Sequence, residues 1–533
     1  MESPPNLVSR LASALPQDLD IKAYYLSSEP TSTNALFSPL PGSTEEPTIS
    51  ESHFLAISSP EHDGVKEVLV FAIEILIFTT ENLTTLFVSK ADSSGFSSRL
   101  KAPKGFPSVV STVTSTFVDY LLEPRLNRSR VVLSLFARSQ HQYLFPGSIE
   151  NPGKHVLDDR QLVKWWCRVL DQVLRLHSDT SDPPLKSSAH LVVPGCDKGE
   201  TRAFFPLSSR RDPTSSPKWL NSYPVDLLAA DTSRPPRHLV PRFPDDPKSR
   251  FLDDLDGDFV DDQGHWRSVK TLDQFWEMMS YRQECSAGRL VGFLWLIFSL
   301  GQTTHPALAE LDPLNIEQSA TTSPNHAPLP TPGNSQGQGY GEETVDQIRS
   351  VDLGAELKEP TSPPSSSPAQ VPREHSSPAG PAIGVVNKHD ASHIASTVEG
   401  HILQAHAKQS NATQGQLVLN TSQYQTLMDY LLQLDFAGEE KAAESTKSWI
   451  GKALELTANS VFGLAIRGES VSAQPNGTEQ ANAAPINMLT AVRKKRKADK
   501  IDGNLTDPQT VDSNSGSAVQ LLSAAFVRKK PKG

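Results

Sequence analysis

The sequence predicts an α/β protein built on a mixed β-sheet. Segments rich in β-branched and apolar residues alternate with segments whose apolar residues recur every three or four positions, the spacing of a helix face. Six of the seven Trp residues lie before residue 300, so the side chains that bury the most surface gather in the first three-fifths of the 533-residue chain. Hydrophobic residues make up only 37% of the chain and Pro numbers 42, which indicates one main core.

The first predicted elements are two strands joined by a hairpin. Residues 67–78 and 84–90 are rich in Val, Ile, Leu and Phe, and a polar stretch separates them. Pro107 then opens a segment with one apolar helical face that ends before Pro124. Residues 130–137 form a β-branched and apolar run that is typical of an inner strand.

The later part of the core is predicted to combine helices with another strand. Asp158 is a suitable N-cap for a helix that runs to His177 with a broad apolar face. Residues 189–193 indicate a strand, and the pattern over 272–284 and 289–300 favours two buried helices. Strands and helices therefore alternate rather than segregate, which is why a mixed sheet is expected.

Composition separates the main domain from a long insertion. We expect residues 1–300 to hold the main part of a single domain. Residues 301–395 are expected to be a disordered insertion rich in Pro, Ser and Thr. Within it, residues 305–381 carry thirteen Pro and have Tyr340 as their only aromatic residue, so this stretch cannot bury enough surface to order itself.

The C-terminal part is predicted to contain a docking segment and a basic tail. Helical spacing returns over 422–436 and 439–464, so we expect residues 396–465 to form a helical segment that packs back on the main domain. Residues 466–533 are expected to be disordered. The stretch 490–533 carries ten Lys or Arg against four Asp, a net charge of +6, which leaves −17 for the rest of a chain whose total is −11.

Charge and cysteine content narrow the function classes. An acidic body suits a basic protein partner and poorly suits nucleic-acid binding. Three scattered cysteines are too few for a disulfide framework or a zinc site, so we expect a reducing compartment and no metal. The longest apolar stretches reach about 11 residues, roughly half of a spanning helix, so no membrane segment is predicted. The first residues also lack the pattern of a secretory signal.

The sharpest local motif is Phe-Pro-Asp-Asp-Pro-Lys-Ser-Arg-Phe at 243–251. Its spacing is typical of a helix start, with Asp246 as the N-cap and Pro247 at the first helical position. The functional alternative requires burial, because desolvation makes a carboxylate a better base and an ammonium a better acid. Asp246 could then accept a proton from a lysine, and Asp245 with Asp246 could attract a cationic lysine. Both interpretations stay open.

The stretch Ser-Lys-Ala-Asp-Ser-Ser-Gly at 89–95 has two interpretations as well. It is typical of a turn, with Asp92 bonded to its own backbone and Gly95 at positive φ. Alternatively, the cations that follow it could hold the phosphates of a ligand, although solvated surface charge is the commoner case. These cations are Arg99, Lys101 and Lys104.

Three aromatic residues are candidates for a ligand cavity. Adjacent helical residues point about 100° apart, so only one of Trp165 and Trp166 should be central core, and the other should line a cavity. The hydroxyl of Tyr143 could orient a substrate carbonyl or amine, or Tyr143 could simply pack at a strand exit. The acidic run 253–262 is predicted to be a solvated loop, because it lacks the Gly and the Glu of a calcium loop at the required positions.

Six strings, taken in order, resemble one family. It is the fungal family of histone H3 lysine acetyltransferases that is linked to replication-coupled nucleosome assembly and to the regulation of Ty transposition. The resemblance covers about residues 50–300, then more weakly 420–465 and the basic tail. The strings are Phe87-Val-Ser-Lys-Ala-Asp-Ser-Ser-Gly, Leu135-Phe-Ala-Arg, Gln142-Tyr-Leu-Phe-Pro, Lys154-His-Val-Leu, Lys164-Trp-Trp and Phe243-Pro-Asp-Asp-Pro-Lys-Ser-Arg-Phe.

The resemblance implies a fold and an activity. The fold is a single catalytic domain with a central mixed sheet wrapped by helices, similar to the large metazoan coactivator acetyltransferases. The activity is transfer of acetyl from acetyl-coenzyme A to a core-region lysine of histone H3, without a metal. Histone chaperones are implied to present H3/H4 in the nucleus, in nucleosome assembly and the DNA damage response. The acceptor lysine is implied to attack the thioester directly, without an acyl-enzyme.

The resemblance also implies roles at matching positions. Asp246 is the implied acid/base, and Lys248 is the implied site of acetylation by the enzyme itself. The tunnel for lysine and acetyl is implied to be bordered by Asp92, Trp166 and Asp246, with Tyr143 near the thioester, and Asp245 stays a candidate for its charge alone. The implied contacts of acetyl-coenzyme A are Ala91, Asp92, Ser93, Arg99, Phe136, Gln140, His155, Val156, Leu157 and Trp165.

Two other function classes are kept as alternatives. A nonenzymatic nuclear adaptor would bind histones with its acidic body and would not need acetyl-coenzyme A. A nucleic-acid binder would use the basic tail and would show a steep salt dependence. Saturable binding of acetyl-coenzyme A separates the enzyme from the adaptor.

Overall fold

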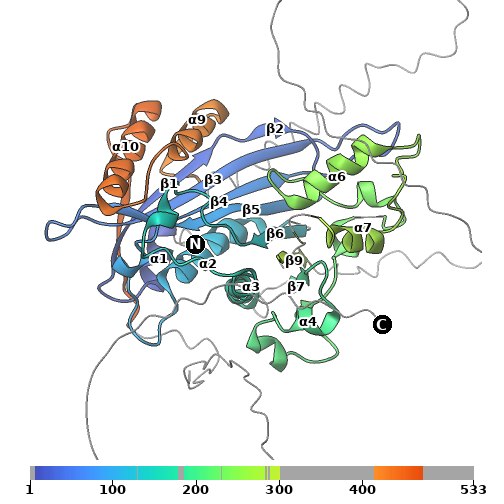
Figure 1. Cartoon of the computed structure of the whole chain (residues 1–533), viewed down its shortest axis with the longest axis horizontal. Coiled ribbons are helices and arrows are strands. Elements are labelled where there is room, and N and C mark those ends of the chain that lie inside the picture. The colour runs from blue at the N-terminus through green and yellow to red at the C-terminus, as the bar shows by residue number, and fades with distance from the viewer. Residues whose placement is uncertain are drawn as a thin grey trace, which may run out of the picture. The chain divides into compact units, whose positions relative to one another are not determined.

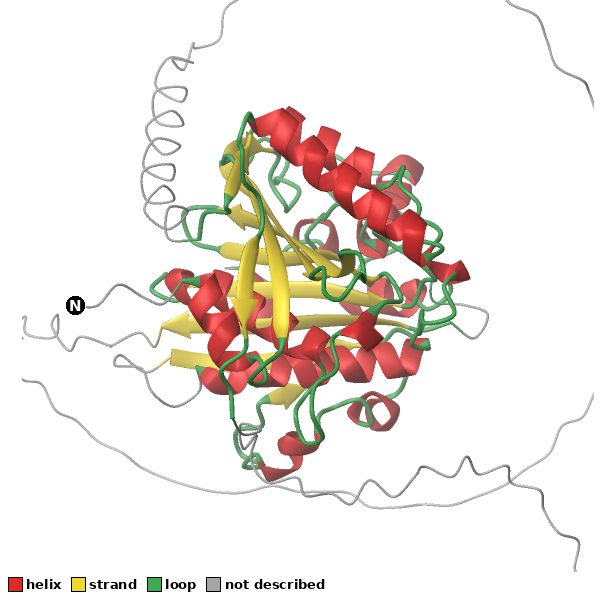
Figure 2. Ribbon diagram, turned by 90° about the vertical axis from the view of Figure 1, so that its left-hand side faces the viewer, coloured by secondary structure: helices red, strands yellow, loops and turns green. Residues whose placement is uncertain are grey.

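The computed structural model describes residues 6–128, 130–177, 185–229, 231–282, 285, 289–300 and 413–471. All of them belong to one unit that spans Met1–Gly477. Over these residues, 11 strands form one mixed sheet, and helices lie on both of its faces (Figures 1 and 2). The predicted fold class, a mixed sheet wrapped by helices, is therefore confirmed.

The strands have the following bounds: β1 Asp20–Ser28, β2 Thr31–Thr33, β3 Thr48–Ser59, β4 Val68–Thr79, β5 Thr84–Ser93, β6 Arg130–Arg138, β7 Leu185–Val192, β8 Trp219–Leu220, β9 Val291–Leu300, β10 Leu417–Leu419 and β11 Leu464–Arg467. Their spatial order is β10-β1-β3-β4-β5-β6-β9-β7-β8, with β11 also on β1 and β2 on β3. The pairs β1–β10, β5–β6 and β7–β8 are parallel, and the others are antiparallel.

The described helices are α1 Leu7–Ala14, α2 Val109–Leu122, α3 Asp159–Leu176, α4 Lys198–Arg202, α5 Val225–Leu228, α6 Pro247–Asp258, α7 Leu272–Met279, α9 Thr421–Leu431 and α10 Glu439–Thr457. Short 3₁₀ turns occupy η1 Ser97–Arg99, η2 Glu123–Arg125, η3 Ser148–Glu150, η4 Leu207–Arg211 and η5 Pro236–His238.

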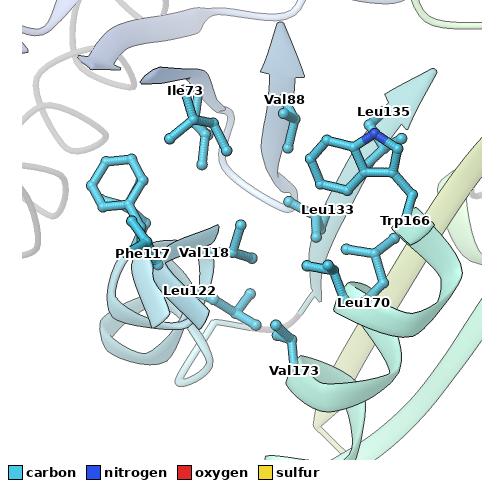
Figure 3. Close-up of a cluster of buried hydrophobic side chains, with 14 of the residues drawn as sticks. Ile73, Val88, Phe117, Val118, Leu122, Leu133, Leu135, Trp166, Leu170 and Val173 are labelled. Carbon is cyan, nitrogen blue, oxygen red and sulfur yellow. The ribbon is translucent and has the colours of Figure 1, made fainter. Parts of the chain in front are cut away.

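Helices α1, α2 and α3 cover one face of the sheet. Their buried side chains share one apolar cluster with residues from strands β1, β3, β4, β5 and β6. Figure 3 shows Phe117 of α2 and Leu170 of α3 in this cluster with Leu133 of β6. Trp166 lies in the same cluster, so α3 fixes this tryptophan directly beneath the sheet.

The opposite face carries two separate groups of helices. Helices α9 and α10 pack on β1, β3 and β4 around the fully buried Trp449. Helices α6 and α7 pack on β6 and β9 around Trp266 and Trp295. The loop that leads into α6 therefore lies on the face opposite to α3, a fact on which the geometry of the site depends.

The parallel pair β5–β6 opens into a fork. The two strands pair up to Val88 and Leu135, although β5 continues to Ser93 and β6 to Arg138. A β-bulge at Ser89 shifts the register between β4 and β5 at the same level. Beyond this level, the described hydrogen-bond ladders join β5 only to β4 and β6 only to β9. We call residues 89–93 and 136–138 the fork.

Several predicted elements are confirmed with small shifts at their ends. The strands expected over 67–78, 84–90 and 130–137 are β4, β5 and β6, and the helix expected after Pro107 is α2. The N-cap predicted for α3 is also correct, because Asp158 accepts a hydrogen bond from the backbone of Gln161. The strand expected at 189–193 begins earlier, at Leu185, and the helix expected over 272–284 ends at Met279.

Two predictions are wrong. Residues 289–300 do not form a helix but the inner strand β9, with β6 on one side and β7 on the other. Its two faces are buried by different clusters, so the run is continuously apolar and periodicity cannot separate it from a buried helix. The acidic run 253–262 is not a loop throughout, because α6 extends to Asp258. Asp256 is held there by Arg237 and Arg242.

The C-terminal segment 413–471 is integrated into the fold. Strand β10 extends the sheet beside β1, and β11 pairs with the start of β1. Helices α9 and α10 cover the face of the sheet opposite to α1, α2 and α3. The two helices end before the predicted limits, at Leu431 and Thr457. The predicted insertion 301–395 lies outside the described residues, as do residues 472–533 of the predicted disordered tail 466–533, whose first two residues belong instead to β11.

Candidate active site

A partly open pocket lies at the fork between β5 and β6. Its wall is built from β4, β5, the loop after β6, the segment before α3, and helices α2 and α3. Ten of the predicted site residues line it: Ala91, Asp92, Ser93, Gln140, Tyr143, His155, Val156, Leu157, Trp165 and Trp166. The fold thus brings together residues from three regions separated by up to 75 positions in the sequence.

Helix α3 supplies both tryptophans of the pocket. Their side chains leave the helix in different directions, as expected for adjacent positions. Trp166 is buried in the core, and Trp165 is half-buried, with its Nε1 donating to Ser111 Oγ at 2.9 Å. The two rings form a T-shaped pair with centroids 4.8 Å apart. The prediction that one tryptophan is core is confirmed, although both border the pocket.

Asp92 organises the polar side of the pocket. Its Oδ2 accepts hydrogen bonds from three successive backbone N–H groups of the loop after β6, from Tyr143 at 2.7 Å, Leu144 at 3.0 Å and Phe145 at 3.3 Å. Its Oδ1 forms an ion pair with Lys154 Nζ at 2.6 Å and accepts the backbone N–H of Ser93. Both oxygens are therefore occupied by the protein itself. Asp92 holds the loop in place, and it is not an isolated acid that faces the pocket.

Tyr143 is fixed by this anchor. Its hydroxyl donates to the carbonyl of Arg138 at 2.8 Å, at the end of β6. Burial raises the pKa of Tyr143 to about 12, while Arg138 opposes this shift and Asp92 adds to it. The phenol therefore stays protonated at neutral pH. It can accept a hydrogen bond or shape the pocket, but it is not a base.

The segment between Lys154 and α3 closes the pocket on another side. Lys154 also donates to the carbonyl of Ser93, which ties this segment to the end of β5. Ser139 Oγ donates to the carbonyl of Leu157 at 2.5 Å, and Ser139 N donates to Asp159 Oδ1 at 3.1 Å. These bonds hold the segment between the two ends of the fork.

The 243–251 motif is buried on the opposite face of the sheet. Asp246 accepts the backbone N–H of Lys248 at 2.9 Å, so it caps α6 with Pro247 at the first position, as its spacing predicted. Phe243 stacks on Phe87 of β5 with ring centroids 4.3 Å apart. The capping interpretation is confirmed, and the burial that the functional alternative requires is present too.

Asp246 and Lys248 form a buried ion pair. Their side chains are 0% and 1% exposed, and Lys248 Nζ donates to Asp246 Oδ2. The ammonium also lies 4.5 Å from the centroid of Phe293. Burial lowers the pKa of Lys248, and the carboxylate of Asp246 opposes this shift. An ammonium in this apolar pocket is costly, and the carboxylate of Asp246 offsets part of that cost.

Asp245 lies beside this pair and faces outward. Its side chain is 71% exposed, and its backbone has a φ of 58°, in the left-handed region that a non-glycine residue occupies only when its surroundings hold it there. Its Oδ2 lies 3.3 Å from Nζ of Lys90, a residue of the fork on β5. Asp245 therefore connects the loop before α6 to the fork.

The tryptophan pocket and the aspartate loop meet the fork from opposite faces. Leu135 of β6 belongs to the cluster that contains Trp166, whereas the next residue, Phe136, packs with Phe87 and Phe243. Phe136 was predicted to contact acetyl-coenzyme A, but it does not line the pocket, because its side chain is on the other face. A substrate that reaches both Trp166 and Asp246 must pass between the strands of the fork.

Arg99 also lies apart from the pocket lining. Its guanidinium donates to the carbonyl of Lys66, pairs with Glu439 and covers the ring of Phe96. These partners come from the β3–β4 loop and α10, so Arg99 links the C-terminal segment to the main domain. Sequence reasoning missed several lining residues, whereas Lys154 and Arg138 belong to the strings that carry the family resemblance. The residues without a prior role in the pocket are Phe71, Ser97, Val110, Ser139 and Leu162.

Two further hollows continue the pocket. One shares Ser97 and Val110 with it and extends toward Pro107 at the start of α2. The other shares Gln140 and Leu157 with it and extends toward Arg289. The chemistry of the central wall, apolar at Phe71, Ala91 and Trp166 and polar at Ser93 and Gln140, suits a flexible arm that carries amides and a thioester.

Two absences concern the described residues. Within the described ranges, no three or more His, Cys, Asp and Glu side chains are grouped so that they could hold a metal ion. No helix of the described chain is long and apolar enough to cross a membrane.

Comparison with protein families and solved structures gives a consistent result. The model of the histone acetyltransferase KAT11-type domain matches residues 7–130 and 125–452. A histone acetyltransferase rtt109 from Aspergillus flavus is 39% identical over 573 aligned residues, which cover 98% of each chain. A histone acetyltransferase rtt109 from Schizosaccharomyces pombe is 33% identical over 247 residues, 45% of this chain and 59% of that protein.

A solved structure is similar across most of the fold. The crystal structure of Rtt109 from Aspergillus fumigatus superimposes with a TM-score of 0.63 at 37% sequence identity. The match covers 87% of this chain and 100% of that one.

Proposed function

Because this chain belongs to the family of KAT11-type histone acetyltransferases, with relatives of the Rtt109 kind along its full length, we propose that it acetylates a core-region lysine of histone H3. The family acts on histones and takes its acetyl group from acetyl-coenzyme A. We propose which lysine accepts the acetyl group, how the substrate arrives and which residues carry out the reaction.

The single observation that carries the mechanism is the fork. The pocket beside Trp166 and the buried Asp246 meet it from opposite faces, and the ladder between β5 and β6 ends there. We assign the pocket to the acetyl donor and the face of Asp245 to the histone. An acceptor lysine would then enter between the strands with its side chain extended, and only its amine would reach the donor.

Acetyl-coenzyme A supplies an activated acetyl thioester. Around it, Trp166 excludes water, and Tyr143 is held as a neutral phenol that can orient a polar group. On the acceptor side, Asp246 takes the proton that the lysine ammonium must lose before its nitrogen attacks. A C–N bond forms and the C–S bond breaks, and the thiolate that leaves takes up the second proton, which the attacking nitrogen loses as it becomes an amide. Asp92 serves by holding the loop of Tyr143.

Acetylation of Lys248 by the enzyme itself fits this scheme. The ammonium of Lys248 occupies Asp246 Oδ2 and competes there with the acceptor lysine. Conversion to a neutral amide would remove the competing charge and most of its desolvation cost. We expect intact-mass and peptide analysis of the purified enzyme to find Lys248 acetylated. A fully active enzyme with unmodified Lys248 would refute this part.

Exposed carboxylates on the acceptor face are accessible to a basic substrate. Asp253 and Asp254 of α6 are 70% and 57% exposed, in the same segment as Asp245, and a histone cation would displace the arginines that pair with them, Arg242 and Arg282. We propose that histone chaperones present H3/H4 to this face, in the nucleus, and that the reaction serves nucleosome assembly and the DNA damage response. The basic tail would act in nuclear import or histone engagement.

Radiolabelled acetyl transfer to H3/H4 tests the proposal. Each reaction is run with and without a histone chaperone, and the modified lysines are mapped by peptide mass analysis. We expect label in the core region of H3, a higher rate with the chaperone, and a loss of at least 100-fold in kcat for Asp246→Asn, roughly the lower limit for general base catalysis. Label on H4 alone, or full activity of Asp246→Asn, would contradict the assignment.

A further inference from the structure

A chain of polar contacts runs from the C-terminal segment to the loop of Asp245. The hydroxyl of Tyr424, on α9, donates to Glu74 Oε1 at 2.9 Å. Lys90 Nζ donates to Glu74 Oε2 at 3.2 Å and lies 3.3 Å from Asp245 Oδ2. These four residues belong to α9, β4, β5 and the loop before α6, which are far apart in the sequence.

Glu74 is the unusual member of this chain. It interrupts the apolar strand Val68–Thr79, and its side chain is only 7% exposed. A buried carboxylate costs free energy unless its oxygens are paired, and an apolar residue would serve packing equally well. Both oxygens of Glu74 are paired, one with Tyr424 and one with Lys90. The carboxylate therefore has a specific task, which is to hold the ammonium of Lys90.

The positively charged side chain of Lys90 lies at the start of the fork, where it can affect the candidate active site. It follows the bulge at Ser89, at the level where β5 leaves β6, and it precedes Asp92 by two residues. Burial alone would lower the pKa of Lys90, but the carboxylates of Glu74 and Asp245 outweigh burial and raise it. The ammonium thus stays charged at neutral pH, and it pairs with Asp245, whose backbone is in the left-handed region with a φ of 58°, next to Asp246.

We propose that Glu74 and Lys90 are a positioning pair for the acceptor side of the reaction, and that Tyr424 makes the C-terminal segment part of this device. Lys90, oriented by Glu74, fixes Asp245 and thereby the backbone that presents Asp246. None of the three touches the reacting atoms. The inference rests on the proposed role of Asp246, so its test must distinguish the two.

Two isosteric variants remove the charges one at a time. Glu74→Gln keeps an oxygen for Tyr424 but loses the charge that holds Lys90, and Lys90→Met keeps the apolar stem without the ammonium. We expect each to lower kcat on H3/H4 about tenfold, because small displacements of catalytic groups have effects of this order. The KM for acetyl-coenzyme A should stay within twofold, because the donor pocket is built by other residues. Lys90→Arg should restore most of kcat.

Non-additivity and a matched control separate positioning from stability. The double variant Glu74→Gln/Lys90→Met should lower kcat no more than either single variant, because the two act as one unit. Tyr24→Phe removes another hydrogen bond between a buried tyrosine and a glutamate, from Tyr24 to Glu67, whose side chain is 22% exposed. It should lower the melting temperature as Tyr424→Phe does. Only Tyr424→Phe should lower kcat per folded molecule.

The outcomes discriminate between the two hypotheses. If Asp246→Asn loses activity while Glu74→Gln and Lys90→Met keep kcat within twofold of the unaltered enzyme, the positioning pair is wrong and the mechanism stands. If Asp246→Asn keeps full activity, the proposed mechanism fails first. A fall in kcat that merely parallels the fraction of folded enzyme would also overturn the positioning role.

Discussion

Replacing one member of the Asp246–Lys248 pair should destabilise the fold far more than replacing both. The side chains are 0% and 1% exposed, so neither remaining charge can reach water. Asp246→Asn leaves the ammonium without a countercharge, and Lys248→Met leaves the carboxylate alone. Each should cost about 3–5 kcal/mol, the usual penalty for breaking a buried pair. The double variant Asp246→Asn/Lys248→Met buries no charge and should cost less than either single change.

Equilibrium unfolding in urea measures the free energy of unfolding of the two single variants and of the double variant. The protein used is first shown by intact mass to carry an unmodified Lys248. A second comparison uses protein with Lys248 acetylated. There Lys248 carries no charge and the carboxylate of Asp246 already lacks its countercharge, so Asp246→Asn breaks no ion pair and should cost no more than about 1 kcal/mol, the value of a single hydrogen bond. Single variants that cost less than 1 kcal/mol, or a double variant that costs the sum of the two, would refute the buried ion pair.

Three further predictions test other parts of the site. Trp166→Phe should lower kcat about tenfold, and it is a cleaner probe than Trp166→Ala, which would cost about 3–5 kcal/mol in the core; equal kcat values would remove Trp166 from the mechanism. Asp92→Asn should lower the melting temperature and raise the KM for acetyl-coenzyme A, because an amide nitrogen cannot accept the loop N–H groups; an unchanged KM would disprove the anchor. Burial lowers the pKa of His190 to about 4, so the unfolded chain takes up the proton first and stability should fall by about 3 kcal/mol from pH 6.5 to 4. His190→Gln should flatten this profile, and an unaltered slope would contradict it.

Helix caps and most strands could be predicted from the sequence, because they depend on residues that are neighbours in the chain. The N-caps at Asp158 and Asp246 follow from a short polar side chain before a helical pattern, and both are present. Strands β4, β5 and β6 follow from runs of β-branched residues. Strand β9 could not be distinguished from a helix, because a run buried on both sides has no periodicity.

The N-terminal strands show what local signals cannot predict. Strand β3 contains the charged or polar residues Glu51 and His53, both buried, so its sequence lacks the continuous apolar run that predicts a buried strand. Arg125, 74 residues later, pairs with Glu51, and Thr413 completes the group. Burial of these polar residues is affordable only after distant segments have met, so no window of the sequence contains the signal.

The candidate site likewise has features that the sequence predicted and features that depend on contacts between distant residues. Recognition of the motif strings predicted most of the pocket lining, because those strings border it. It did not predict that Phe136 faces away or that Asp92 is occupied by the 143–145 loop, because the first depends on how β6 pairs with β9 and the second on a contact between residues 51 positions apart. The Glu74–Lys90 contact also depends on cross-strand register, which the sequence does not state.

The central claim is that donor and acceptor meet through the fork. The most direct test is a crystal structure of the enzyme with a bisubstrate ligand, in which coenzyme A is joined to the side chain of a lysine in an H3 peptide. We predict the coenzyme A part in the pocket beside Trp166, the lysine side chain between residues 89–93 and 136–138, and the peptide on the face of Asp245. A ligand with both halves on the same face of the sheet would contradict the account.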